Sequence, residues 1–255
     1  MTEHSEILLI EKRGEVEWVT MNRPDRLNAL SKEMVRRLRG YFEEKYDDKE
    51  TRVIVLKGAG RAFCAGLDLK EEGTRGSVED SLKGQTNIRD IYKAMRRCPQ
   101  PIISLIKGAA CGGGFSLALA SDIRIVGESA KLNAAYLTIG LTGCDMGSSY
   151  FLPRLVGASL ASELLLTGRF IHAQEAVMHR LVSKVVPDDE LDDAPTEMIE
   201  AMLATSKMGL QLTKDALNFA IDAPSMDAAM AMEDRQQILL STANDEFRSR
   251  REKYQ

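Results

Sequence analysis

Two segments in which glycine-rich sequence follows a β-branched run constrain this chain more than any other feature. The first covers residues 61–68 (RAFCAGLD), and the second covers residues 107–116 (KGAACGGGFS). Glycine lets a backbone approach a ligand closely, and a strand-to-helix turn leaves amide N–H groups unpaired. Two such turns side by side can point two N–H donors at one carbonyl oxygen, which is an oxyanion hole.

The composition is that of an ordinary water-exposed globular protein. Of the 255 residues, 44% are hydrophobic and 28% are charged, which is enough apolar material for one large domain with or without a smaller appendage. The net charge of -4 gives no reason to expect nucleic-acid binding.

Targeting, membrane and metal signals are absent from the sequence pattern. The acidic start, residues 1–7, lacks the basic and apolar parts of a signal peptide, and the most apolar region, 102–126, is interrupted by charges. The four cysteines have no CxxC spacing, which favours a reduced, cytoplasmic setting, and the three scattered histidines suggest no metal site.

Strand-like and helix-like patterns alternate through the first three quarters of the chain. We expect strands at 7–12, 16–21, 53–57, 101–106, 123–126 and 182–186, and helices at 31–46, 86–97, 158–166, 173–179 and beyond 194. The polar stretch 70–85, with its three glycines, reads as mobile. Repeated strand–turn–helix units predict an α/β core over residues 1–193 and a helical region over 194–255 that serves oligomerisation or covers a bound ligand.

The helix expected after the first two strands has a clear beginning and a clear apolar face. Ser31 is a suitable N-cap residue. The face consists of Met34, Val35, Leu38, Phe42 and Tyr46.

Taken in order, these segments resemble the enoyl-CoA hydratase/isomerase (crotonase) superfamily. Residues 22–30 (NRPDRLNAL) are similar to its first acyl-CoA-binding loop, and 62–70 and 108–124 are similar to its two oxyanion segments. Further matches lie at 140–147, 152–155, 166–169 and 181–186, so the resemblance covers nearly the whole chain.

The resemblance implies a spiral of repeated ββα units with a C-terminal helical region that packs trimers or hexamers. It implies an acyl-CoA thioester as substrate, with no cofactor beyond the coenzyme A of that substrate. It places the oxyanion N–H donors at Leu67 and Gly113. It also assigns coenzyme A contacts to Arg26, Leu27, Ala65, Leu67, Asp68 and Gly113; Asp68 is also expected to brace its own turn.

The sequence departs from the well-known hydratases at two acidic positions. The resemblance places their two glutamates where this chain has Ser116 and Tyr136. Ser116 either holds a water or packs its helix, and Tyr136 either hydrogen-bonds substrate or shapes the acyl pocket. Asp145, in the turn 143–147, is the candidate acid/base, as in some members of the superfamily; its alternative role is to cap the following helix.

The leading hypothesis is therefore an acyl-CoA-processing enzyme, nominally an enoyl-CoA hydratase. The alternatives are a double-bond isomerase with Asp145 as its single base, a hydrolase of an acyl-CoA or a β-diketone, and an acyl-CoA-binding protein with little turnover. Cys64, Cys111 and Cys144 fall within the same segments, but no histidine lies there to activate a nucleophilic thiol.

Overall fold

A six-stranded sheet organises the structure, which is a computed structural model that describes residues 6–71, 77–243, 249 and 252. Its strand order is β1-β2-β3-β4-β6-β9; β1 runs antiparallel to β2, and the other neighbours are parallel. The strands are β1 (Leu8–Arg13), β2 (Val16–Met21), β3 (Val53–Gly58), β4 (Ile102–Ile106), β6 (Ile123–Gly127) and β9 (Lys184–Val186). The two connected β-strands at the start and the later parallel strands agree with the α/β prediction.

A second sheet of three short strands lies beside the first. It has the order β5-β7-β8, with β5 (Ala109–Cys111), β7 (Lys131–Asn133) and β8 (Ile171–His172). The chain passes from the large sheet to the small one at β4–β5 and again at β6–β7, and a helical segment follows each time. These repeated ββα units wind as a spiral, as predicted.

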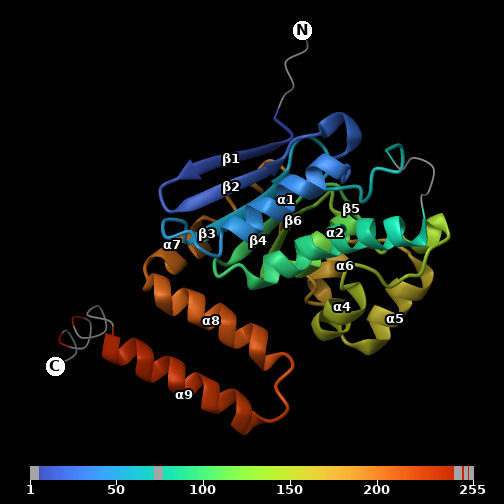
Figure 1. The fold of residues 1–255 in the computed structure, drawn as a ribbon. Helices are drawn as coiled ribbons and strands as arrows, with labels where there is room; N and C mark the ends of the chain where they lie inside the picture. The colour runs from blue at the N-terminus through green and yellow to red at the C-terminus, as the bar shows by residue number, and fades with distance from the viewer. Residues whose placement is uncertain (1–5, 72–76, 244–248, 250–251, 253–255) are drawn as a thin grey trace.

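Helices cover the sheets on the outside (Figure 1). They are α1 (Lys32–Glu44), α2 (Val78–Arg97), α3 (Gly113–Ala120), α4 (Ser148–Val156), α5 (Ala158–Thr167), α6 (Ala173–Met178), α7 (Thr196–Leu203), α8 (Lys207–Ala220) and α9 (Met226–Ala243). Two 3-10 turns, η1 (Pro24–Arg26) and η2 (Leu137–Ile139), precede α1 and α4.

The parallel strands β2, β3, β4 and β6 of the large sheet are buried on both faces, whereas the edge strand β1 is mostly exposed. In β3, Ile54 and Leu56 join the core under α1, α2 and α3, whereas Val53 and Val55 join a second core. That second core is covered by apolar residues of α7, among them Met198 and Ile199. The near-continuous hydrophobic run of the strand follows from this two-sided burial.

Helix α1 begins as predicted but ends earlier. The Ser31 hydroxyl accepts a hydrogen bond from the Met34 N–H, and Met34, Val35, Leu38 and Phe42 are buried. The prediction for Tyr46 is wrong: the helix ends at Glu44, and Tyr46 is 69% exposed. Because Tyr46 lies beyond the last helical turn, the spacing that buries the apolar face of α1 does not extend to it.

Helix α2 is longer than its expected span of 86–97. It begins at Val78 because Ser77 and Asp80 form a capping box, in which each side chain bonds the other residue's backbone N–H. The stretch expected to be mobile is therefore helical over residues 78–85, and its part at 72–76 lies outside the described residues. The strand expected at 182–186 begins at Lys184.

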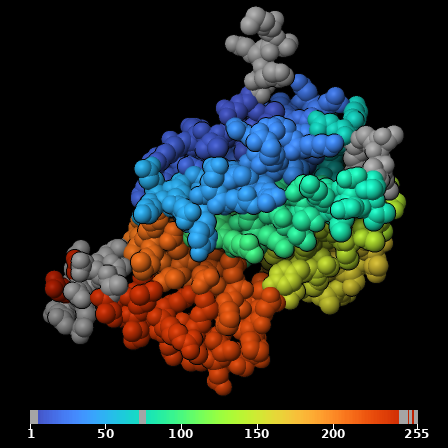
Figure 2. All heavy atoms as spheres, viewed as in Figure 1, coloured from blue at the N-terminus to red at the C-terminus, as the bar shows by residue number. Residues whose placement is uncertain are grey.

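The C-terminal helices attach to the core through buried polar contacts. The Arg52 guanidinium donates to the carbonyls of Met202, Leu203 and Thr205 at the end of α7, over 2.6–3.1 Å. Lys214 of α8 is buried and pairs with Asp122 at 2.8 Å. Figure 2 shows α8 and α9, in orange and red, lying together at one side of the body. In the part of the chain that the structure describes, no helix has the length and apolar character needed to cross a membrane.

Candidate functional site

The two glycine-containing turns are joined by backbone hydrogen bonds. The Phe63 N–H donates to the Lys107 carbonyl at 2.7 Å, and the Cys64 N–H donates to the Ala109 carbonyl at 3.0 Å. The Cys111 N–H returns a bond of 2.9 Å to the Cys64 carbonyl. Segments about fifty residues apart in the sequence therefore lie side by side, as the oxyanion-hole prediction requires.

Glycine is required where the turns touch. A Cβ atom on Gly66, whose φ is +95°, would lie 2.8 Å from the Cys111 carbonyl oxygen and 3.5 Å from the Gly113 nitrogen. A Cβ atom on Gly114 would overlap the Cys64 carbonyl oxygen. Because real Cβ atoms do not approach backbone atoms this closely, these glycines permit the contact between the two turns.

Leu67 and Gly113 carry N–H groups that are left unpaired. The Leu30 N–H donates to the Gly66 carbonyl, and the Asp68 N–H donates to the Leu30 carbonyl. Because neighbouring residues of an extended strand point their N–H groups to opposite sides, the Leu67 N–H between them points away from Leu30. Gly113 is the first residue of α3, and a first-turn N–H has no partner within its helix. Neither group donates to any residue within the described ranges.

Ser116 and Tyr136 form a buried pair of hydroxyl groups. Their oxygen atoms are 2.8 Å apart, and the side chains come from α3 and from the residue preceding η2. The Ser116 hydroxyl is also 3.4 Å from the backbone carbonyl of Asp145. Burial, with the nearby Asp145 charge adding to it, raises the pKa of Tyr136 above its ordinary value, so the phenol is neutral.

Asp145 lies beside this pair in the turn before α4. Its Oδ1 atom accepts hydrogen bonds from Gln85 Nε2 at 2.6 Å and from the Met146 N–H at 2.7 Å. The alternative role as helix cap is wrong: Gly147, in the left-handed conformation, occupies the N-cap position, and no side chain caps α4. The side chain is half-buried, so it remains reachable.

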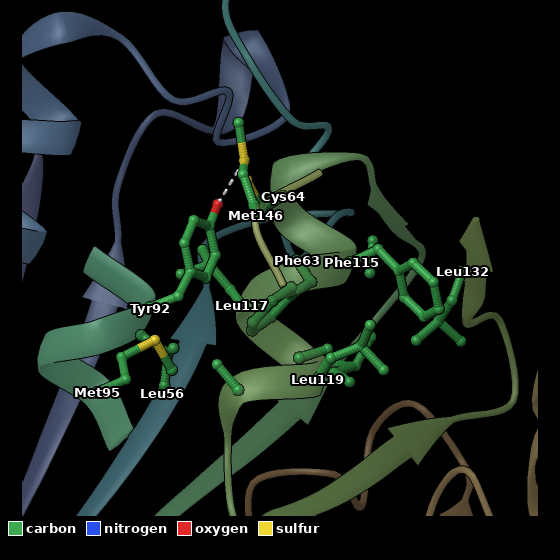
Figure 3. Close-up of a cluster of buried hydrophobic side chains, with 14 of the residues drawn as sticks. Leu56, Phe63, Cys64, Tyr92, Met95, Phe115, Leu117, Leu119, Leu132 and Met146 are labelled. Carbon is green, nitrogen blue, oxygen red and sulfur yellow. Dashed lines mark hydrogen bonds between the residues drawn. The ribbon is translucent and has the colours of Figure 1, made fainter. Parts of the chain in front are cut away.

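Tyr92 joins α2 to the same site, a contact that the sequence analysis did not identify. Its buried hydroxyl donates to the Gly113 carbonyl at 3.0 Å and lies 3.0 Å from the Met146 sulfur (Figure 3). Burial raises the pKa of Tyr92 well above its usual value, so this phenol is also neutral. The spacing of Gln85, Ile88 and Tyr92 places them on one face of a helix, and this pattern could have indicated the contact. It was missed because the helix was expected to begin only at residue 86.

The residues predicted to contact coenzyme A lie near the first turn. Arg26 is exposed, whereas Leu27 is half-buried and accepts a hydrogen bond from the Ala65 N–H at 3.0 Å. The Asp68 carboxylate pairs with Arg23 at 2.9 Å and accepts from the Lys70 N–H, so it braces its turn as expected. Burial acts to raise the pKa of Asp68, but the hydrogen bonds from Arg23 and Lys70 and the charges of Arg23 and Arg26 together lower it. Contacts with a nucleotide stay a prediction.

The thiols near the turns are poor nucleophiles. Burial raises the pKa of Cys64 to about 12 and that of Cys111 to about 11, so both are protonated near neutral pH. Among the residues that the structure describes, no group of three histidine, cysteine or acidic side chains is arranged to hold a metal ion.

The fold and the two adjoining turns define an α/β enzyme of the crotonase type, and comparisons with known proteins agree. The family model described as enoyl-CoA hydratase/isomerase matches residues 11–254. A probable enoyl-CoA hydratase of Mycobacterium bovis is 39% identical over 248 residues, which cover 94% of this chain and 87% of that protein. The chain belongs to the enoyl-CoA hydratase/isomerase family.

Solved structures support the same assignment. An enoyl-CoA hydratase from Bacillus anthracis has a TM-score of 0.90 and 32% identity, covering 95% of this chain and 93% of that chain. A monofunctional enoyl-CoA isomerase from Mycobacterium smegmatis has a TM-score of 0.76 and 37% identity, covering 89% of this chain and 99% of that one. The fold is therefore shared by proteins named for two different reactions.

Proposed function

We propose that this enzyme binds an unsaturated acyl-CoA, stabilises its enolate through the N–H groups of Leu67 and Gly113, and uses Asp145 as its acid/base. The observation that carries the proposal is the pair of unpaired N–H groups on turns that touch at Gly66. A thioester oxygen gains negative charge as the enolate develops, and one fixed donor to such an oxygen contributes about 3 kcal/mol. The N-terminus of α3 adds positive potential at the same place.

Hydration of a 2-enoyl-CoA is the first candidate reaction, and the names of the relatives favour it. Asp145 takes a proton from water while the water oxygen bonds C3, and the pair of electrons of the double bond moves toward the thioester. Asp145 then returns a proton to C2. Ser116 and Tyr136 remain neutral, so they orient the water or the substrate by hydrogen bonding and do not remove a proton.

Double-bond isomerisation is the second candidate, and the replacement of both expected carboxylates favours it. With Ser116 and Tyr136 in those places, Asp145 is left as the acid/base beside the hydroxyl pair. A single carboxylate is sufficient to take a proton from C4 and return one to C2 of the same dienolate. No water is consumed in this reaction.

One experiment separates the candidates. The purified enzyme is incubated in deuterated water with 2-enoyl-, 3-enoyl- and aryl-CoA thioesters, and mass spectrometry follows water addition, deuterium uptake and free coenzyme A. Water addition supports hydration, exchange or migration without it supports isomerisation, and free coenzyme A identifies a hydrolase. Asp145→Asn should abolish turnover while thioester binding persists; undiminished turnover in that variant would exclude Asp145 as the base.

For the coenzyme A moiety, the same proposal gives Arg26, Leu27, Ala65 and Asp68 the role of lining its site. The exposed Arg26 guanidinium suits the nucleotide phosphates, and Leu27 and Ala65 are already in contact. Arg26→Ala should therefore raise KM for an acyl-CoA but not for an acyl-pantetheine, which lacks the nucleotide. An equal change for both substrates would remove Arg26 from the site.

The oligomer proposed for this enzyme is a trimer or a pair of trimers formed through the C-terminal helices. Large apolar side chains are exposed on this region, as oligomer interfaces require. They include Leu217, Phe219, Ile221, Met226, Met230, Ile238 and Leu239. Light scattering coupled to size exclusion gives the mass in solution, and a monomer at micromolar concentration would contradict the proposal.

A further inference from the structure

We propose that Gln85 is a positioning residue that selects which oxygen of Asp145 reacts. This inference rests on the proposed role of Asp145 as acid/base. Gln85 lies in the segment that the sequence pattern assigned to a mobile loop, and the structure instead places it in the second turn of α2, with its amide nitrogen 2.6 Å from Asp145 Oδ1.

The hydrogen bonds to Asp145 are unequally divided between its two oxygens. Gln85 Nε2 and the Met146 N–H both donate to Oδ1. Oδ2 accepts no hydrogen bond from any residue in the described ranges. The two donors therefore hold the plane of the carboxylate through one oxygen and leave the lone pairs of the other available to a substrate proton.

The backbone of Asp145 is held as firmly as its Oδ1 atom. Its N–H donates to the Ser148 hydroxyl at 3.1 Å, and its carbonyl accepts from the Ser148 N–H at 2.9 Å. With the backbone fixed, rotation about the side-chain bonds is the remaining freedom of the carboxylate. The Gln85 bond restricts that rotation.

The helix that carries Gln85 is anchored to the oxyanion turn itself. Gln85 and Tyr92 are seven residues apart and lie on one face of α2, with the partly buried Ile88 between them. Tyr92 bonds the Gly113 carbonyl and contacts the Met146 sulfur (Figure 3). One rigid face of α2 thus sets the position of the carboxylate relative to Gly113, which a proton transfer at C2 requires.

The donors around Asp145 are neutral, so they orient the carboxylate without the strong pairing that a cation would supply. No lysine or arginine in the described ranges lies within ion-pair distance of its oxygens. The titratable groups that face it are the buried phenols of Tyr92 and Tyr136, and Cys144 precedes it in the chain. A glutamine amide in this place therefore orients the carboxylate without neutralising its charge.

Two variants of the exposed Gln85 and one control variant test this inference without disturbing the core. Gln85→Leu removes the donor at similar size, and Gln85→Glu keeps the shape but sets a second carboxylate against Asp145. Lys83→Met, two residues away on a different face of α2, is the matched control. We expect Gln85→Leu to lower kcat about tenfold with KM nearly unchanged, Gln85→Glu to lower it further, and Lys83→Met to have no effect.

The pH profile of kcat and a double-mutant cycle distinguish a positioning role from a merely structural one, because loss of a structural contact alone would change neither. Gln85→Leu should shift the acidic limb of the profile to higher pH, because the ionised carboxylate has lost a donor. In an Asp145→Asn background it should change the residual rate no further.

The outcomes distinguish this inference from the proposed function. If Asp145→Asn abolishes turnover while Gln85→Leu and Gln85→Glu keep the wild-type kcat and pH profile, the positioning role is wrong and the proposed function stands. If Asp145→Asn remains active, or the wild-type enzyme turns over no thioester, the proposed base fails and the role of Gln85 fails with it.

Discussion

Replacing Gly66 by alanine tests the contact on which the oxyanion hole depends. The new Cβ atom would lie 2.8 Å from the Cys111 carbonyl oxygen, about half an ångström closer than ordinary contact. Because that oxygen belongs to backbone, the two turns must separate to relieve the overlap. The φ of +95° adds strain, since alanine adopts this conformation at a cost of about 1–3 kcal/mol.

The expected result is a large loss of rate with a smaller loss of stability. Displacing one of two oxyanion donors by part of an ångström should lower kcat about a hundredfold. The free energy of unfolding should fall by about 1–3 kcal/mol, which a protein of ordinary stability tolerates. Urea unfolding measures the second quantity, and steady-state kinetics on the best thioester from the panel measures the first.

Gly14→Ala is the control for backbone strain alone. Gly14 has a φ of +63° in the turn between β1 and β2, and nothing lies within 4 Å of the Cβ position. It should lose about 1 kcal/mol of stability and keep the wild-type kcat. If Gly66→Ala also keeps the wild-type kcat, the contact between the turns is not what positions the donors, and the argument from Gly66 fails.

Two further predictions concern stability. The buried Arg124 guanidinium donates hydrogen bonds to the carbonyls of Ala118, Ser121 and Leu181. Because Arg124→Met would leave these carbonyls unsatisfied, it should lower the free energy of unfolding, measured by urea titration, by about 2–4 kcal/mol. A loss below about 1 kcal/mol would contradict this. Burial acts to raise the pKa of Glu17, but hydrogen bonds from Lys45, Tyr41 and Thr51, with the Lys45 charge, together lower it in the folded state. The stabilisation is therefore present above the unfolded pKa of about 4.3 and is lost as pH falls below it. Glu17→Gln should therefore differ most from wild type near pH 7 and least near pH 3 in the same assay, and an equal difference at both pH values would refute the linkage.

The sequence was sufficient for the parts of the fold that local physics determines. The β-branched runs predicted the strands of the large sheet, and Ser31 predicted the start of α1, because both signals depend on neighbouring residues. The start of α2 was missed although Ser77 and Asp80 were legible as a capping box. The polar composition and the glycines of residues 70–85 favoured a mobile stretch over the helix start that these two residues indicate.

The candidate site was predictable in part. The two turns were recognised from their glycine motifs, and the resemblance to the family then placed the N–H donors at Leu67 and Gly113. The bond between Gln85 and Asp145 joins residues 60 positions apart through the packing of α2, and no local pattern encodes it. The pairing of Ser116 with Tyr136 is similar: the sequence predicted their positions at the site, but only the fold gives the 2.8 Å that joins them.

The chemistry open to the enzyme follows from the number of groups that are able to exchange a proton. Ser116 and Tyr136 are neutral and bonded to each other, so they do not replace two carboxylates in removing and returning different protons. The proposed base, Asp145, must therefore return the same proton that it took, or one exchanged with solvent in between. In deuterated water, retention of the substrate proton indicates proton transfer within a closed site, whereas a solvent deuteron at C2 indicates that the carboxylate of this half-buried residue exchanges with water. Both reactions need the oxyanion donors, so Gly66→Ala should slow whichever one the enzyme catalyses, while addition of water to the product separates them.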